Sequence, residues 1–176
     1  VTTHLKITVE YIKDNYLIFT IKISIIGFFI LSLVYGISKL INHYDIVGDN
    51  DAHKLTQLFQ ISTKNSYLRP ALISLIPMIA VLRNNKIDWL LIQSYFYFLI
   101  TNLVFSATYI DLKDITLVIV NVIGFLFIML FILLMNKNKI SNLAYGIKKS
   151  ELIKINMIAS VIGIAITIIL ALIKGY

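Results

Sequence analysis

Three long stretches of this chain contain no charged residue: 89–110, 115–135 and 155–173. A helix that crosses the hydrocarbon core of a bilayer needs about 20 mostly apolar residues, because the core is about 30 Å thick and a helix rises about 1.5 Å per residue. Each stretch therefore predicts a transmembrane helix. The composition agrees, since 59% of the 176 residues are hydrophobic and only 14% are charged, a balance outside the range of soluble domains.

A fourth predicted span, residues 16–38, carries one charge, Lys22, near its start. A lysine at that depth can extend its long stem and keep its ammonium group among the headgroups. The apolar run is longer than the core of a cleavable signal peptide, which is about 7–15 residues, and no small-residue cleavage site follows it. We therefore expect this segment to stay in the protein as a membrane anchor.

The segment 67–82 allows two interpretations. Only residues 70–82 are free of charge, which is short for a crossing. If Arg69 and Arg83 extend into the two headgroup layers, the segment can cross a locally thin bilayer. We predict an all-α, polytopic membrane helix bundle with five transmembrane helices, formed by residues 1–176 as a single integral membrane domain. The alternative has four spans plus one re-entrant or interfacial segment.

The lysines and arginines that flank the spans predict the orientation, because cytoplasmic loops retain them. With five crossings, ten of the 16 basic residues lie on one side: Lys6, Lys13, Lys22, Arg83, Lys86, Lys137, Lys139, Lys148, Lys149 and Lys154. With four crossings the division becomes eleven to five, and the N-terminus changes sides. Both topologies place the loop 136–154 in the cytoplasm and the C-terminus outside, and five crossings place the N-terminus in the cytoplasm.

The source and compartment follow from composition and orientation together. Lysine and isoleucine are abundant in this chain, a bias that favours a bacterial source. We therefore expect a multi-pass protein of the bacterial inner (cytoplasmic) membrane.

The loop 136–154 is rich in lysine. Its lysines are Lys137, Lys139, Lys148, Lys149 and Lys154. Their role in orientation and their contact with anionic lipid headgroups account for these charges. A nucleic-acid-binding surface would favour arginine with interleaved aromatic residues, and this loop has one aromatic residue, Tyr145. We expect a lipid-facing basic loop and no nucleic-acid partner.

One loop concentrates possible metal ligands. They are His43, Asp45, Asp49, Asp51 and His53. The pattern lacks the glycine and the distal bidentate glutamate of a calcium-binding EF-hand. A zinc site built from the two histidines and one aspartate is geometrically possible, but polar side chains in an exposed loop are more often solvated. We therefore expect no metal and no cofactor.

The predicted spans contain no His, Asp or Glu. Hydrolysis within the membrane needs a nucleophile with a positioned base, and the serines of the spans have no such partner. The chain also has no cysteine, and therefore no thiol nucleophile. We expect no enzymatic activity and no catalytic residue.

Amide side chains are prominent among the polar groups inside the predicted spans, at Gln93, Asn102 and Asn121. The connection between the spans 89–110 and 115–135 is so short that these helices must form an antiparallel hairpin. Asn102 and Asn121 then lie at depths that differ by only about 3 Å. We expect the two amides to hydrogen-bond and to hold the hairpin together.

Small residues recur every four positions in the last span, at Ala159, Gly163, Thr167 and Ala171. Side chains four residues apart share one face of a helix. Close backbone approach along small residues is what helix packing in lipid requires. We predict that this stripe is a packing seam, formed within the protein's own bundle or with a partner.

Packing, anchoring and orientation account for most of these features. They favour a non-enzymatic integral membrane protein that acts through intramembrane protein–protein interaction, as an accessory or assembly subunit or as an immunity-type factor. Its partner would be another membrane protein or a second copy of the chain. The alternative is a small transporter or channel component that works as an oligomer, with a pathway lined by Gln93, Asn102 and Asn121.

Overall fold

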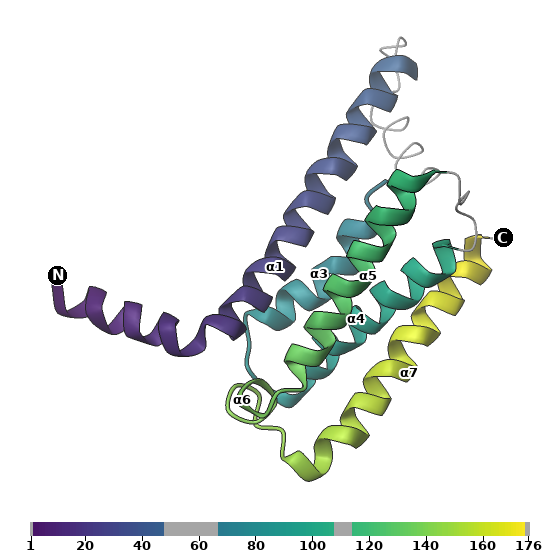
Figure 1. Cartoon of the computed structure of the whole chain (residues 1–176). Helices are drawn as coiled ribbons and strands as arrows, with labels where there is room; N and C mark the ends of the chain where they lie inside the picture. Colours follow the sequence, from purple (N-terminus) through teal and green to yellow (C-terminus); the bar gives the residue numbers. More distant parts are fainter. Residues whose placement is uncertain (1, 48–66, 108–113, 175–176) are drawn as a thin grey trace. The chain divides into compact units, whose positions relative to one another are not determined.

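The structure is a computed structural model, and it describes residues 2–47, 67–107 and 114–174 (Figure 1). In those residues the regular structure is helical, without a β-strand. The helices are α1 (Thr2–Val47), α3 (Arg69–Val81), α4 (Lys86–Ala107), α5 (Ile115–Met135), α6 (Asn138–Ser141) and α7 (Lys149–Lys174). The predicted all-α class is therefore confirmed.

Four of the described helices contain a segment long and apolar enough to cross a membrane. These segments are Tyr16–Asn42, Lys86–Phe105, Ile115–Met135 and Lys149–Leu172. They correspond to four of the five predicted spans and indicate a membrane protein. The segment predicted at 67–82 forms α3, which has only 13 residues. The fifth crossing therefore stays a prediction.

Capping explains where α4 begins, three residues before the predicted span. The Asn85 side chain accepts a hydrogen bond from the Asp88 backbone N–H at 3.0 Å, and the Asp88 carboxylate accepts one from the Asn85 N–H at 3.1 Å. This reciprocal arrangement satisfies two N–H groups that a helix start would leave unpaired. The first turn of α4 therefore includes charged residues that a hydropathy argument excludes.

The other span boundaries follow the same logic. α5 has the predicted bounds, and Asp114 caps it by accepting from the Leu117 N–H at 3.1 Å. α7 begins at Lys149, six residues before the predicted start at 155. Its first turn carries Glu151, whose negative charge suits the N-terminal end of a helix.

Contacts divide the chain into two compact units, residues 1–21 with 80–176 and residues 22–79. In the first unit α4 is the central helix and packs against both α5 and α7 (Figure 1). An aromatic pair joins α4 to α5, where Phe96 stacks on Phe131 at 5.3 Å between ring centroids. Within α5, Phe127 meets Phe131 edge-on at 4.7 Å. The result is a three-helix layer with α4 in the middle.

The second unit contains residues 22–47 of α1 and residues 69–79 of α3. Gly36 of α1 lies against the turn that leads into α3. A Cβ atom at position 36 would come within 2.8 Å of the Tyr67 carbonyl oxygen and 3.1 Å of the Leu68 Cδ2 atom. Glycine is therefore required for this approach, because a larger residue would push the turn away.

Candidate functional site

The closest contact between α4 and α7 is made at Gly163. A Cβ atom there would lie 2.6 Å from the Ser94 carbonyl oxygen, 2.6 Å from the Tyr97 Cβ atom and 2.7 Å from the Phe98 backbone nitrogen. Two of these three atoms belong to the α4 backbone, which has no rotamer to change. We call this contact the α4–α7 seam. It joins the α7 residues Asn156, Ala159, Gly163 and Thr167 to the α4 residues Gln93, Ser94, Tyr97 and Phe98.

The structure places most of the predicted small-residue stripe in this seam. Ala159 is completely buried. The Thr167 hydroxyl lies 3.3 Å from the Gly163 carbonyl oxygen in its own helix and 3.5 Å from the Phe98 carbonyl oxygen of α4. Ala171 is half-buried. Within the described chain the stripe therefore faces α4 rather than the lipid.

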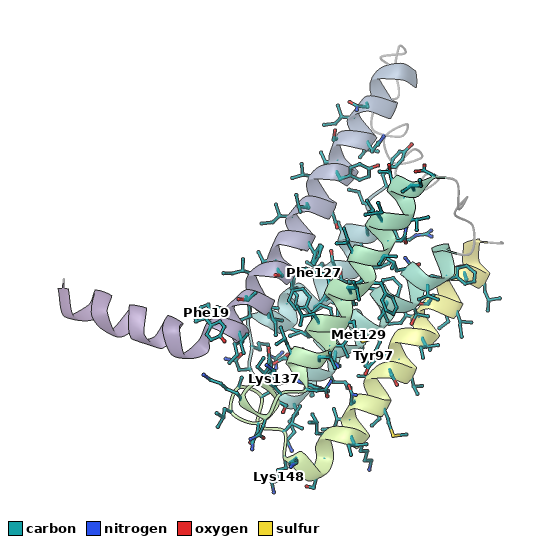
Figure 2. All side chains as sticks on the ribbon, in the orientation of Figure 1. Phe19, Tyr97, Phe127, Met129, Lys137 and Lys148 are labelled. Atoms are coloured by element: carbon teal, nitrogen blue, oxygen red, sulfur yellow. The ribbon has the colours of Figure 1, made fainter. Side chains whose placement is uncertain are left out.

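A hydrogen-bonded amide cluster lies at one end of the seam. The Gln93 amide nitrogen donates to the Asn156 side-chain oxygen at 2.9 Å, and the Tyr97 hydroxyl donates to the same oxygen at 3.2 Å. The Gln93 nitrogen also lies 3.5 Å from the Ile132 carbonyl oxygen of α5. This cluster therefore links all three helices of the layer. Figure 2 shows Tyr97 on α4 beside α7.

Two buried polar atoms in α4 have no hydrogen-bond partner in the structure. They are the Gln93 side-chain oxygen and the Ser94 hydroxyl. A buried acceptor without a donor carries a desolvation cost that its neighbours do not offset. The cluster is therefore only partly satisfied, and Asn156 is its hub because it accepts both bonds.

The predicted hydrogen bond between Asn102 and Asn121 is not among the hydrogen bonds of the described residues. The Asn121 amide nitrogen donates to the Leu117 carbonyl oxygen at 3.0 Å, within its own helix. Asn102 is exposed on α4, and Asn121 is half-buried on α5. The hairpin contact near them is apolar, with Gly124 of α5 facing the Leu103 side chain of α4. A similar depth of two residues along neighbouring helices does not determine the rotation of each helix about its axis.

Residues 136–148, which we call the cap, connect α5 to α7 as a folded element. The short helix α6 is followed by Gly146, whose φ of 66° suits a residue without a side chain. The Gly146 N–H donates to the Asn142 carbonyl oxygen at 2.8 Å, and the Ile147 N–H donates to the Ser141 carbonyl oxygen at 2.9 Å. These bonds hold the backbone in one turn.

Three apolar residues of the cap are buried, whereas its lysines are exposed. The buried residues are Ile140, Tyr145 and Ile147. Directly before the cap, the Trp89 indole donates to the Met135 carbonyl oxygen at 3.0 Å. The five predicted lipid-facing lysines are all exposed: Lys137, Lys139, Lys148, Lys149 and Lys154. Figure 2 labels Lys137 and Lys148 at the two ends of the cap.

Burial gives Tyr145 unusual acid–base behaviour. Desolvation raises the pKa of its hydroxyl from 10.0 to about 12, and the nearby negative charge of Asp88 adds to this increase. Asp88 is itself buried and lies 3.9 Å from the Arg83 guanidinium. The base of the cap therefore keeps Tyr145 neutral over the whole physiological range.

The candidate metal ligands fall largely outside the described chain. Asp49, Asp51 and His53 lie outside the described residues, and His43 and Asp45 belong to α1 without described side chains. Among the residues that the structure describes, no group of three or more His, Asp or Glu side chains could hold a metal ion. The metal candidates therefore stay untested.

Sequence reasoning missed two residues of this site, Asn156 and Trp89. A signal for Asn156 was present, because it precedes Gly163 by seven residues and therefore lies on the same helix face. A tryptophan at the start of a span favours the membrane interface, but Trp89 is completely buried. No periodicity in the sequence indicates its hydrogen bond to Met135.

Comparison with protein families, with characterised proteins and with solved structures finds no match to this chain. The function is therefore inferred from the α4–α7 seam, the amide side chains and the cap.

Proposed function

We propose that this protein is a non-enzymatic integral membrane protein that acts by contacting another membrane-embedded helix, either in a distinct partner or in a second copy. The observation that supports this proposal is the position of Asn102 and Asn121. Asn102 is exposed on the candidate span of α4, and Asn121 is half-buried on α5 with its amide nitrogen bonded only to its own helix.

Exposed amides are costly in hydrocarbon. A polar group that faces lipid without a partner loses the hydrogen bonds that water would supply. Amide side chains in membrane helices therefore usually bond across a helix–helix interface. Since Asn102 and Asn121 do not bond to each other, a helix from another molecule is the group that can satisfy both. This supports an accessory, assembly or immunity-type role.

Photo-crosslinking in native membranes tests the proposal. The chain has no cysteine, so a single introduced cysteine can carry a benzophenone. Attached at Asn102→Cys or Asn121→Cys, the probe should form a discrete protein adduct. Ile119→Cys is the matched control, because it is exposed on α5 about 160° around the helix from Asn121. Equal adducts at all three sites, or none, would contradict a specific contact.

The alternative function, an oligomeric transporter or channel component, has support from the amide cluster, because polar groups inside membrane helices can mark a pathway. Gln93 is completely buried between helices, whereas Asn102 is exposed. The amides that would line the pathway therefore do not share a surface within one copy. Ion or solute flux into vesicles that contain the purified protein would favour this alternative.

For the topology we propose five crossings of the bacterial inner membrane, with the cap in the cytoplasm. The contact at Gly36 supports the fifth crossing, and the distribution of lysine and arginine supports the cytoplasmic position of the cap. Gly36 lies six residues before Asn42, the end of the first candidate span, so Tyr67 begins about 9 Å inside that end. In the second unit α3 then runs in the direction opposite to α1 (Figure 1). The 13 residues of α3 span about 20 Å. Together with the depth of about 9 Å at which Tyr67 begins, this length approaches the thickness of the hydrocarbon core, about 30 Å.

Labelling of single cysteines with an impermeant maleimide on intact cells tests the topology. Five crossings predict labelling at Asn50→Cys and Gly175→Cys, two positions outside the described residues, and protection at Asn142→Cys in the cap. Labelling at position 175 without labelling at position 50 would instead favour four crossings. Labelling at position 142 would contradict both topologies.

A further inference from the structure

Positive charge at the cap is only partly neutralised by the protein. Two acidic residues lie beside the cap, Asp88 of α4 and Glu151 of α7. Asp88 accepts from the Asn85 N–H and lies near Arg83. Glu151 is paired with Lys86 at 2.7 Å, and the positive charge of Lys148 also interacts with that carboxylate. The five exposed lysines named above lie in the cap or in the first turns of α7, and we call them the cap lysines. They form no ion pair within 4 Å with any side chain that the structure describes.

The fold of the cap fixes the backbone that carries these lysines. Its side chains Ile140, Tyr145 and Ile147 are buried, and its backbone hydrogen bonds close the turn. The lysines therefore stay on one folded element between two spans, with their side chains exposed. A concentrated positive surface of this kind fits an anionic partner.

One apolar side chain stands among these charges. Leu143 is 77% exposed, between the buried residues Ile140 and Tyr145. The cap directly follows Met135, the end of the α5 span, and directly precedes Lys149, where the α7 span begins. A short loop between two spans lies at the level of the headgroups, where a leucine can enter the acyl boundary while lysines stay beside the phosphates.

We propose that the cap is a binding surface for anionic phospholipid, with the cap lysines on the phosphate groups and Leu143 inserted into the interface. The Trp89 indole of α4 donates to the carbonyl oxygen of Met135, the residue directly before the cap, so lipid bound at the cap stabilises the packing of α4 on α5. This inference does not depend on the partner contact at Asn102 and Asn121, which belongs to the opposite ends of α4 and α5.

Thermal unfolding of the full-length protein in detergent tests this inference. Trp89 is the single tryptophan of the chain. It is buried and bonded to Met135, directly before the cap, so its fluorescence reports unfolding next to the cap. Phosphatidylglycerol should raise the Tm by several degrees more than the same mole fraction of phosphatidylcholine. The difference between the Tm shifts with the two lipids is electrostatic, so 0.5 M NaCl should remove most of that difference.

Four variants locate the effect. Replacing Lys137, Lys139, Lys148 and Lys149 together by Gln should abolish the selective shift, while the Tm in phosphatidylcholine stays unchanged or rises because repulsion is removed. Leu143→Ser should reduce the shift with both lipids. Lys139→Gln and Lys39→Gln are a matched pair, since each removes one exposed lysine, and only the former should weaken the selective shift.

Three results would overturn the proposal. One is an equal shift with both lipids in the unmodified protein, which would leave an acidic protein surface as the occupant of the cap. Another is a selective shift that survives in the fourfold Gln variant, which would locate lipid binding elsewhere. A fourfold variant that unfolds at a lower Tm in phosphatidylcholine would show that the lysines stabilise the fold, and would also contradict the proposal.

Discussion

Gly163 lies so close to Ser94 that a Cβ atom at position 163 would come within 2.6 Å of the Ser94 carbonyl oxygen. In lipid there is little hydrophobic gain when two helices meet, so close packing and weak polar contacts must hold them together. A glycine at the point of closest approach allows that packing along the α4–α7 seam. The amide cluster then adds hydrogen bonds at one end of the same seam.

The α4–α7 seam predicts a large loss of stability when Gly163 is replaced by alanine, which adds only one methyl group. Gly163→Ala should lower the free energy of unfolding by about 1–3 kcal/mol, because the added methyl group overlaps the α4 backbone. Gly27→Ala is the matched control, since no atom lies within 4 Å of the added Cβ. It should be neutral or stabilising by up to about 1 kcal/mol. Titration with a denaturing detergent, followed by circular dichroism, measures both.

Equal effects of these two substitutions would contradict the seam as an internal contact. If Gly163→Ala leaves stability unchanged but abolishes a crosslink to another molecule, the stripe instead contacts a partner.

The amide cluster predicts a ranking of substitutions. Asn156→Leu removes the acceptor of both Gln93 and Tyr97 and should cost about 1–3 kcal/mol. Gln93→Leu should cost less, because it also removes a buried oxygen that has no partner, and Asn156 keeps its bond from Tyr97. Tyr97→Phe should likewise cost less than Asn156→Leu. The same detergent titration ranks all three.

A double-mutant cycle separates the Gln93–Asn156 bond from the other effects of these changes. The coupling energy should be about 0.6 kcal/mol, the average for side-chain hydrogen bonds in a membrane protein. A coupling of zero would show that the two amides do not interact in the membrane.

The turn before α3 predicts a second glycine requirement. Gly36→Ala places a methyl group 2.8 Å from the Tyr67 carbonyl oxygen, and it should lower the Tm by several degrees, an effect of about 1–2 kcal/mol. Gly27→Ala is again the control, because both glycines lie in α1. A Tm that is unchanged in Gly36→Ala would show that the turn does not pack on α1.

The raised pKa of Tyr145 predicts a loss of stability at high pH. A hydroxyl with a pKa of about 12 in the folded protein and 10.0 otherwise stays protonated longer when folded. Its contribution is therefore fully present below pH 10 and is lost as the pH rises toward 12. The loss can reach about 1.4 kcal/mol per pH unit. Tyr145→Phe should lack this component, so the Tm curves of the two proteins should be parallel up to pH 10 and diverge above it.

The sequence alone determined which segments are long and apolar enough for the membrane. For α5 the predicted bounds, 115–135, agree with the observed helix, because an uninterrupted apolar run and an Asp114 cap act in the same direction. For α4 and α7 the sequence predicted the helix but not its first turns. Charged residues are unfavourable in hydrocarbon but are compatible with a helix. Hydropathy therefore predicts where the membrane span ends and not where the helix ends.

The tertiary structure decided which face of each helix meets which neighbour. Depth along the chain placed Asn102 and Asn121 side by side, yet Asn121 bonds within α5, and the amides that meet across helices are Gln93 and Asn156. It also decided that Trp89 is buried and bonds to Met135 of α5. Rotation about a helix axis depends on many dispersion contacts, each of only about 0.1–0.2 kcal/mol. No single residue in the sequence reveals that sum, and it exists only once the helices are packed.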